Sequence, residues 1–383
     1  MADAPSGTRD ELAAQLALGQ VPGIGAARLR TLVAAFETAA AALQAPAGAL
    51  AALPGFGRAA AAAVRGARLE AGREILAQLD RLGATVLVWG DARFPPLLRE
   101  IPDPPVLLYA WGDLSLLSRP AAAIVGSRNH SAYGAEAART LALGVARYVV
   151  VASGMARGLD AIAHAAALDA GGDSVGVLGN GFGVVYPAAN RALYERMIAH
   201  GCLVTELPPG ERPHAGAFPR RNRLISGLGG VTVVVEAAPG SGALITADCA
   251  LEQGRSVLAV PGPITSPTSL GCNKLIQQGA KPALSAADVL EELGITAGRR
   301  PEDGITPGRR PAVDQPGRTA PPDLTELQQA LWRALESEAK HVDALVAVVG
   351  TLGAATADVL TALTGLELRG LVRQEPGMVF GRA

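Results

Sequence analysis

Short runs of apolar, largely β-branched residues alternate with helix-length segments between about residue 84 and residue 292, and this pattern constrains the fold more than any other feature. Continuous apolar runs of this length are typical of strands that are buried on both faces of a parallel sheet. The pattern therefore predicts an α/β fold, a Rossmann-like doubly wound and mostly parallel sheet, over residues 84–293. The expected strands are Thr85–Trp89, Val106–Trp111, Ala122–Val125, Tyr148–Ala152, Ser174–Leu178, Leu203–Glu206, Val231–Val235 and Ser256–Val260.

Residues 1–83 are predicted to form a separate helical domain. Two similar turns, Val21–Gly25 and Leu53–Gly57, each precede a helix rich in Ala and Arg. They resemble the tandem helix-hairpin-helix (or SAM-like) arrangement of DNA-binding proteins, in which backbone N–H groups at a helix start hold a phosphate. A Pro-Gly-x-Gly run is also an ordinary tight turn between helices, and the two interpretations stay open.

The C-terminal part of the sequence predicts a linker and a second small domain. Residues 294–322 are rich in Pro, Gly and Arg and cannot form a core, so we expect a solvated tether. Residues 323–383 have the outline of a winged helix, with a hairpin over Leu368–Phe380. The expected recognition helix, Ala355–Thr364, carries no Arg or Lys, which favours a structural or protein–protein role over groove binding.

Composition places the protein in the cytoplasm and limits how it could bind a polyanion. The formal net charge is −1, so any nucleic-acid site must be a local patch. The three cysteines are far apart, which favours neither a disulfide framework nor a zinc site. The N-terminus lacks a signal-peptide pattern, and no stretch approaches the ~20 apolar residues of a membrane helix.

The carboxyl ends of the expected strands carry the residues that could bind a ligand. The first such segment is Gly126–Ser131, in which Gly126 permits a sharp turn while Ser127, Ser131 and the helix start can hold an anion. Arg128 adds a bidentate, permanently charged donor. Arg157 follows the next strand in the same way, so we expect both arginines at one edge of the sheet.

Three arginines in four positions open another helix, in the segment Phe218–Arg223. Unpaired cations are unfavourable at a helix N-terminus unless an anion faces them. A bound phosphate is one such anion, and Glu206 or Glu236 is the alternative for at least one of the three.

A single strand needs a cationic groove and aromatic faces for its bases. Lys274, in a chain with only three lysines, adds to the expected groove, and Phe218 or Tyr133 could supply the stacking face.

Several enzyme classes lack their signatures here. No G-x-x-x-x-G-K-[ST] run is present, which excludes a P-loop, and Gly179–Gly183 does not match the dinucleotide fingerprint. His164 is a lone histidine on an Ala-rich helix and is interpreted as structural. No nucleophile, base and orienting group can be assembled from adjacent motifs, so we expect neither an enzyme nor a cofactor or metal.

Taken together, the motifs resemble those of the DprA/Smf family, the bacterial DNA-processing protein A. The resemblance runs from about Phe94 to Ala280 and rests on seven segments in family order. They are FPPLLREIPDPPVLLYAWG, IVGSRNHSAYG, SGMARGLDAIAH, YPAAN, FPRRNRLISGLGG, EAAPGSGALITADCALEQGR and PGPITSPTSLGCNKLIQQGA.

The resemblance implies a non-enzymatic protein that binds single-stranded DNA entering during natural transformation, protects it, and loads the RecA recombinase onto strands covered by single-strand-binding protein. It also implies a homodimer formed through the Rossmann-like domain; the sequence leaves open whether transformation or general repair is the setting. The DNA-binding residues expected from the pattern and the resemblance are Gly126, Ser127, Arg128, Ser131, Arg157, Phe218, Arg220, Arg221, Asn222, Arg223 and Lys274.

Two rival functions come from other classes. Glu236 and the run Pro239–Gly242 are similar to part of the site of Rossmann-like (LOG-type) nucleotide phosphoribohydrolases, but the glutamate of their P-G-G-x-G-T-x-x-E run is missing. A transcription factor acting through residues 323–383 is disfavoured by the uncharged recognition helix.

Overall fold

The computed structural model describes residues 6–295, 324–335, 340–349, 354–369, 371–375 and 378–382. The chain divides into two compact units, Met1–Ile305 and Thr306–Ala383. Residues 296–322 of the expected linker lie outside the described residues. Within the described ranges, no helix combines the length and apolar character needed to cross a bilayer, and no group of three or more His, Cys, Asp or Glu side chains could hold a metal ion.

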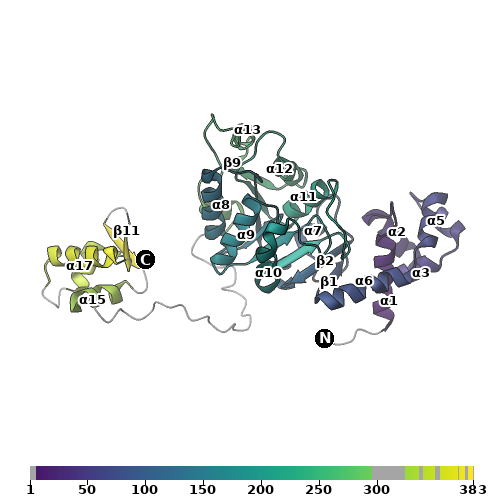
Figure 1. Cartoon of the computed structure of the whole chain (residues 1–383), viewed down its shortest axis with the longest axis horizontal. Coiled ribbons are helices and arrows are strands. Elements are labelled where there is room, and N and C mark those ends of the chain that lie inside the picture. Colours follow the sequence, from purple (N-terminus) through teal and green to yellow (C-terminus); the bar gives the residue numbers. More distant parts are fainter. Residues whose placement is uncertain are drawn as a thin grey trace. The chain divides into compact units, whose positions relative to one another are not determined.

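A nine-stranded sheet forms the centre of the first unit (Figure 1). Its strands are β1 (Thr85–Val88), β2 (Leu107–Gly112), β3 (Ala121–Val125), β4 (Val150–Ser153), β5 (Ser174–Val177), β6 (Cys202–Thr205), β7 (Val231–Val234), β8 (Ser256–Ala259) and β9 (Lys281–Pro282). The spatial order is β1-β2-β6-β5-β4-β3-β7-β8-β9. All pairs from β6 to β9 are parallel, whereas β1–β2 and β2–β6 are antiparallel. The mostly parallel, Rossmann-like sheet is thus confirmed.

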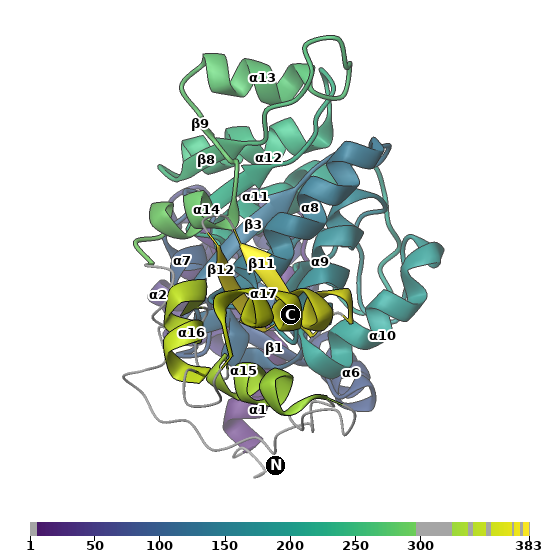
Figure 2. The ribbon, with the colours of Figure 1, turned by 90° about the vertical axis from the view of Figure 1, so that its left-hand side faces the viewer.

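Helices cover both faces of the sheet, which explains why its strands are continuously apolar. Ile124 of β3 packs on the face covered by α8 (Ala132–Val145), α9 (Leu159–Asp169) and α14 (Ala286–Glu292). Its neighbour Val125 packs on the opposite face, under α7 (Pro96–Arg99), α11 (Ala217–Leu228), α12 (Gly242–Glu252) and α13 (Leu270–Gln277). Figure 2 shows α12 and α13 beside β8 and β9.

The strand order reverses between β3 and β7. From β3 the chain moves outward through β4 and β5 to β6, with α10 (Arg191–His200) preceding β6, and then returns through α11 to β7 on the other side of β3. Such a reversal separates the loops that leave the two adjacent strands and opens a crevice at their carboxyl ends. The loops after β3 and β7 are therefore where a ligand is expected.

The N-terminal helices build one core of their own and share another with the sheet. They are α1 (Ser6–Gly19), α2 (Ala26–Phe36), α3 (Ala39–Gln44), α4 (Ala47–Ala51), α5 (Arg58–Gly66) and α6 (Leu69–Leu82). Leu18, Leu32 and Leu50 are buried among these helices. Leu16 and Leu79 instead pack in a cluster that includes residues of β1 and β2. The helical segment is consequently continuous with the sheet domain and belongs to the same compact unit.

The two glycine-rich turns adopt matching conformations. Ile24 N–H donates to the carbonyl of Val21, and Phe56 N–H donates to that of Leu53, each at 3.0 Å. Both turns precede a helix, α2 and α5 respectively.

The second unit contains a winged helix, as expected. Its described elements are α15 (Glu326–Ala334), β10 (Lys340–His341), α16 (Val342–Val349), α17 (Thr356–Leu368), β11 (Val372–Glu375) and β12 (Val379–Arg382). The strands form one antiparallel sheet in the order β10-β12-β11. Leu331, Leu345 and Leu363 from the three helices form its core with Phe380.

Candidate nucleic-acid interface

The loop after β3 is folded against β7 by its own polar groups. Ser127 N–H donates to the carbonyl of Glu236 at 2.8 Å, and the Ser127 hydroxyl donates to the carbonyl of Asn129 at 2.7 Å while accepting its N–H at 3.1 Å. A Cβ at Gly126 would lie 2.5 Å from Leu159 Cδ1, so any larger residue there would require Leu159 to shift. These contacts fix the backbone of the loop and leave the Arg128 side chain exposed.

Ser131 acts as the N-cap of α8. Its hydroxyl accepts Gly134 N–H at 3.0 Å and donates to Glu236 Oε1 at 2.5 Å, while its own N–H donates to Glu236 Oε2 at 2.9 Å. Glu236 is buried and also accepts from Thr268 Oγ1 at 3.0 Å. The anion at this helix start is therefore an internal carboxylate, which differs from the expectation that Ser131 holds a ligand.

The same contacts bear on the phosphoribohydrolase alternative. Glu236 is occupied by Ser131 and Thr268 and is buried. Ser241, in the glycine-rich run, is the N-cap of α12. Glu236 is therefore bonded inside the protein, whereas Ser241 also lines a cavity beside the loop after β3.

Arg128 and two aromatic rings form one wall of a pocket. The guanidinium carbon of Arg128 lies 5.3 Å from the centroid of the Phe218 ring, and the Tyr186 ring lies 5.5 Å from it on centroids. The cavity they line has a volume of about 320 Å³ and is completed by the loops after β4 and β5, including Arg157 and Asn180. We refer to it as the aromatic pocket. A cation, a half-buried phenylalanine ring and an exposed tyrosine ring are thus side by side at the carboxyl edge of the sheet.

Arg157 lies in a loop that is held by hydrogen bonds from Asn190. Met155 has a positive φ of 54°, an unfavourable conformation for a residue with a side chain. Asn190 Nδ2 donates to the carbonyls of Met155 at 3.0 Å and Ala156 at 3.3 Å, which stabilises the loop. Arg157 is exposed and donates to Asn129 Oδ1 at 3.2 Å, so it lies next to the loop that carries Arg128.

Arg221 lies beneath the pocket rather than in solvent. It is 5% exposed and donates to the carbonyls of Gly154 and Val177. Burial lowers the pKa of Arg221 to about 10, opposed by the nearby charge of Asp160, so the guanidinium remains protonated at neutral pH. Arg221 therefore ties the ends of β4 and β5 to α11 as an internal cation.

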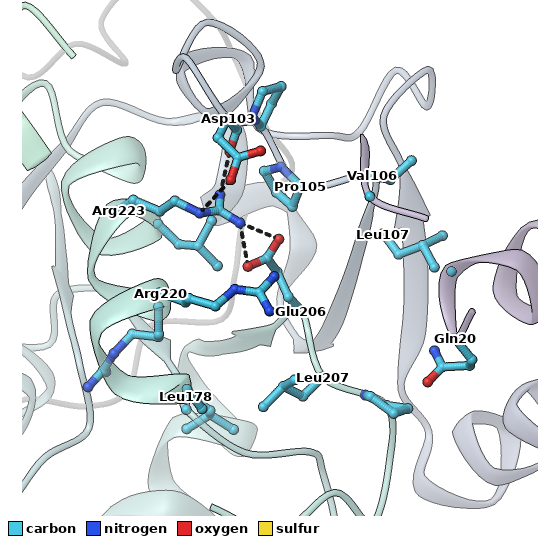
Figure 3. Close-up of a pocket in the computed structure, with 18 of the residues that line it drawn as sticks. Gln20, Asp103, Pro105, Val106, Leu107, Leu178, Glu206, Leu207, Arg220 and Arg223 are labelled. Carbon is cyan, nitrogen blue, oxygen red and sulfur yellow. Dashed lines mark hydrogen bonds and ion pairs between the residues drawn. The ribbon is translucent and has the colours of Figure 1, made fainter. Parts of the chain in front are cut away.

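Of the other residues in the arginine-rich segment, two also make internal contacts. Asn222 Nδ2 donates to the carbonyl of Gly242 at 3.0 Å. Arg223 donates to both carboxylate oxygens of Glu206, at 2.5 and 2.6 Å, and to the carbonyl of Asp103 at 2.5 Å (Figure 3). This pair is one of the alternatives that the sequence left open. Arg220 is exposed and, in the part of the chain that the structure describes, has no hydrogen bond or ion pair.

Two further pockets adjoin the aromatic pocket. The glycine-loop pocket, about 840 Å³, lies at the reversal of strand order between the loops after β3 and β7 and shares Arg128, Phe218 and Arg221 with the aromatic pocket. The hairpin pocket, about 330 Å³, lies on the other side and shares Leu178, Gly179 and Arg221 with it. Lys274 is exposed on α13 and lines none of the three.

His164 has the structural role expected of it. Its Nδ1 lies 2.7 Å from the Ser174 hydroxyl, which itself donates to the carbonyl of Val151, and its Nε2 accepts Met155 N–H at 3.3 Å. Burial, reinforced by the charge of Arg221, lowers the pKa of His164 to about 3. The imidazole is therefore neutral and fully bonded.

Tyr186 is the member of the aromatic wall that the sequence did not lead us to expect. It belongs to the YPAAN segment, a motif to which the sequence assigns no role. A tyrosine before a proline, in the loop that follows β5, is the signal that could have indicated it. Tyr133, the other aromatic candidate, instead donates its hydroxyl to the carbonyl of Pro261 at 2.7 Å and lines none of the three pockets.

Comparisons with known proteins indicate one family for both units of the chain. A family model described as DNA recombination-mediator protein A matches residues 85–294, and one described as DprA winged helix domain matches residues 315–378. Protein Smf of Synechocystis is 35% identical over 396 residues, covering 97% of this chain and 99% of that protein. DNA processing protein DprA of Bacillus subtilis is 43% identical over 221 residues, covering 57% of this chain and 74% of that protein.

Two solved structures that are similar to this chain belong to the same family as these relatives. The crystal structure of DNA processing protein A from Streptococcus pneumoniae has a TM-score of 0.61 and 34% identity, covering 74% of this chain and 97% of that one. DNA processing protein A from Helicobacter pylori, described for its single-stranded DNA binding mode, has a TM-score of 0.50 and 27% identity, covering 55% of this chain and 95% of that one. With a family model that matches more than half of its residues and a relative aligned along nearly its full length, the chain belongs to the DNA recombination-mediator protein A family, whose members are also called DprA or Smf.

Proposed function

We propose that the protein binds single-stranded DNA in the aromatic pocket, protects strands that enter during natural transformation, and loads RecA recombinase onto them in the cytoplasm. The observation that carries the DNA-binding part is the juxtaposition of Arg128, Phe218 and Tyr186 at one edge of the sheet. The Helicobacter pylori relative, described for its single-stranded DNA binding, supports the same ligand.

The pocket has the two components that single-strand binding requires. Arg128 and Arg157 can neutralise backbone phosphates, and Phe218 and Tyr186 offer ring faces on which bases stack irrespective of sequence. Base faces are inaccessible within a stacked duplex, so ring stacking favours single strands over double strands. We therefore expect tight, salt-dependent binding with little base preference.

The remaining parts of the proposal rest on family membership. A recombination mediator must act where single-strand-binding protein and the recombinase compete for one strand, and the family description supports this role. A homodimer formed through the Rossmann-like domain completes the proposal, and pull-down with RecA together with sedimentation of the free protein test these parts.

The DNA-binding part is tested by salt titration of oligonucleotide binding, followed by fluorescence anisotropy. The variants are Arg128→Ala and Arg157→Ala, and the control is Arg147→Ala. Arg147 is an exposed arginine between α8 and β4, at the opposite edge of the sheet. Removing one arginine–phosphate interaction should reduce the slope of log K against log salt by about 0.7 for a single strand. Equal slopes in all three variants, or equal affinity of the wild type for duplex, would refute the assignment.

A further inference from the structure

The hairpin pocket lies where the N-terminal helices meet the sheet. It is bounded by the turn between α1 and α2, by the segment that precedes β2, and by the first turns of α11 (Figure 3). Ile24 and Gly25 of the first glycine-rich turn line it, whereas the second such turn lines none of the three pockets. Of the two turns for which the sequence leaves a phosphate-binding role open, one thus faces a cavity.

One of the three arginines that line the hairpin pocket forms no ion pair among the described residues. Figure 3 shows Arg220 and Arg223 extending from the same helix toward Glu206. Arg223 neutralises Glu206 through both carboxylate oxygens and lies 3.4 Å from the carboxylate of Asp103. Arg221 is offset by buried Asp160. Arg220 is exposed and, among the described residues, forms no ion pair, although its charge acts on Glu206 and opposes the rise that burial causes in the pKa of that carboxyl. Its guanidinium therefore keeps hydrogen-bond donors for an anion that enters the pocket.

Apolar side chains form part of the walls around Arg220, beside the charged groups. The apolar lining residues include Leu107, Leu178, Leu207 and Leu224, and Gln20 also lines the cavity. Its volume of about 330 Å³ lies at the lower end of the range in which small-molecule ligands bind. A flat, partly apolar group attached to a phosphate matches this combination of walls and charge. A nucleotide is such a group.

The hairpin pocket is adjacent to the proposed DNA site. The two cavities share Leu178, Gly179 and Arg221, so one layer of residues separates them. A strand that leaves the aromatic pocket on this side reaches Arg220 next.

We propose that the hairpin pocket is a second nucleotide subsite of the same single strand, in which Arg220 binds a backbone phosphate and the apolar walls receive the attached nucleoside beside the α1–α2 turn. The inference rests on the proposed function and extends it, because it gives the N-terminal helices a direct part in binding. The ligand class is a nucleotide, and the source to which we commit is the strand already held in the aromatic pocket.

The first test compares homothymidine oligomers of increasing length, from about 4 to about 16 nucleotides, the range of known single-strand site sizes. Wild-type affinity should rise at the length that spans both pockets. Arg220→Ala should weaken that affinity about tenfold and reduce the salt slope by about 0.7, for the longer oligomers only. Arg220→Lys should retain the slope because it keeps the charge.

Arg147→Ala, which removes one arginine from the opposite edge of the sheet, is the matched control and should behave as wild type at every length. Identical length profiles for Arg220→Ala and Arg147→Ala would overturn the inference while leaving the aromatic pocket in place. Failure of wild-type protein to bind any oligomer would overturn the proposed function, and this inference with it.

The second test locates the strand directly. Oligomers that carry 4-thiothymidine at one position are cross-linked to the wild-type protein, and the modified peptide is identified by mass spectrometry. One position should cross-link near Phe218, and a position further along should cross-link near Leu207 or Gln20. A free nucleotide is the alternative occupant of the hairpin pocket, and thymidine monophosphate is used to test it. If it filled the hairpin pocket without competing with long oligomers, the pocket would be an independent nucleotide site and the inference would be wrong.

Discussion

The guanidinium of Arg128 lies over the face of the Phe218 ring, with 5.3 Å between the guanidinium carbon and the ring centroid. The two residues come from different elements, the loop after β3 and the first turn of α11. Their contact places a cation, which can bind a phosphate, beside an aromatic face, which can stack with a base. Charge and stacking are thus carried by separate side chains and can be removed one at a time.

Replacement of Phe218 by leucine should weaken single-strand binding without changing its salt dependence. The loss of one stacked base costs about 1–3 kcal/mol, and the phosphate contacts remain. Salt titration with a homothymidine oligomer measures both quantities. Tyr133→Leu is the matched control, because Tyr133 is exposed but lines none of the pockets. A reduced slope in Phe218→Leu would contradict the separation of the two roles.

Replacement of Arg223 by alanine should affect folding more than DNA binding. Its side chain is 14% exposed and its partner Glu206 is 19% exposed, so the variant leaves a largely buried carboxylate without its cation. Breaking a buried pair in this way costs about 3–5 kcal/mol of unfolding free energy. Urea unfolding measures the loss, and Glu206→Gln in the same chain should recover part of it. An unchanged unfolding free energy together with a reduced salt slope would instead assign Arg223 to the DNA.

Ser131→Ala separates a helix cap from a ligand contact. The substitution removes the N-cap of α8 and one of the donors to Glu236, and removal of such a cap costs about 1–2 kcal/mol. Affinity for single strands and its salt slope should stay at wild-type values, since the hydroxyl is already bonded inside the protein. A change in slope with unchanged stability would restore the ligand role that the sequence predicts.

The strands of the sheet can be predicted from the sequence because each one is specified by its own short apolar run. Each apolar run specifies a strand that is buried on both faces, and all eight expected strands are present in the structure. The two-residue strand β9 is too short to produce such a run. The direction of β2, which is antiparallel to both of its neighbours, depends on where the chain returns, which the runs themselves do not encode.

The arginine-rich segment shows the limit of that reasoning. Spacing alone places Arg220, Arg221 and Arg223 in the first turns of one helix, but successive residues of a helix are rotated by about 100°. Arg220 consequently faces solvent, whereas Arg221 points under the sheet edge. The acidic partners Asp160 and Glu206 are far away in the sequence. Only the fold reveals which cation is already paired.

The buried histidine makes the stability of the fold depend on pH. His164 has a pKa of about 3 in the folded protein, because burial and the charge of Arg221 disfavour the imidazolium. In the unfolded chain a histidine titrates near about 6.5. Below about pH 6.5 the unfolded state therefore binds one more proton than the folded state, so the contribution of His164 is complete above that pH and is lost as the pH falls toward 3.

The expected slope is a loss of about 1.4 kcal/mol of unfolding free energy per pH unit between about pH 6 and pH 4 from this residue. Because buried carboxylates also contribute in this range, the quantity to measure is the difference between wild type and His164→Gln in urea unfolding at several pH values. His200→Gln, at the exposed end of α10, is the control and should follow the wild type. Parallel pH profiles for wild type and His164→Gln would mean that the imidazole takes up its proton inside the fold, which the hydrogen bonds to Ser174 and Met155 argue against.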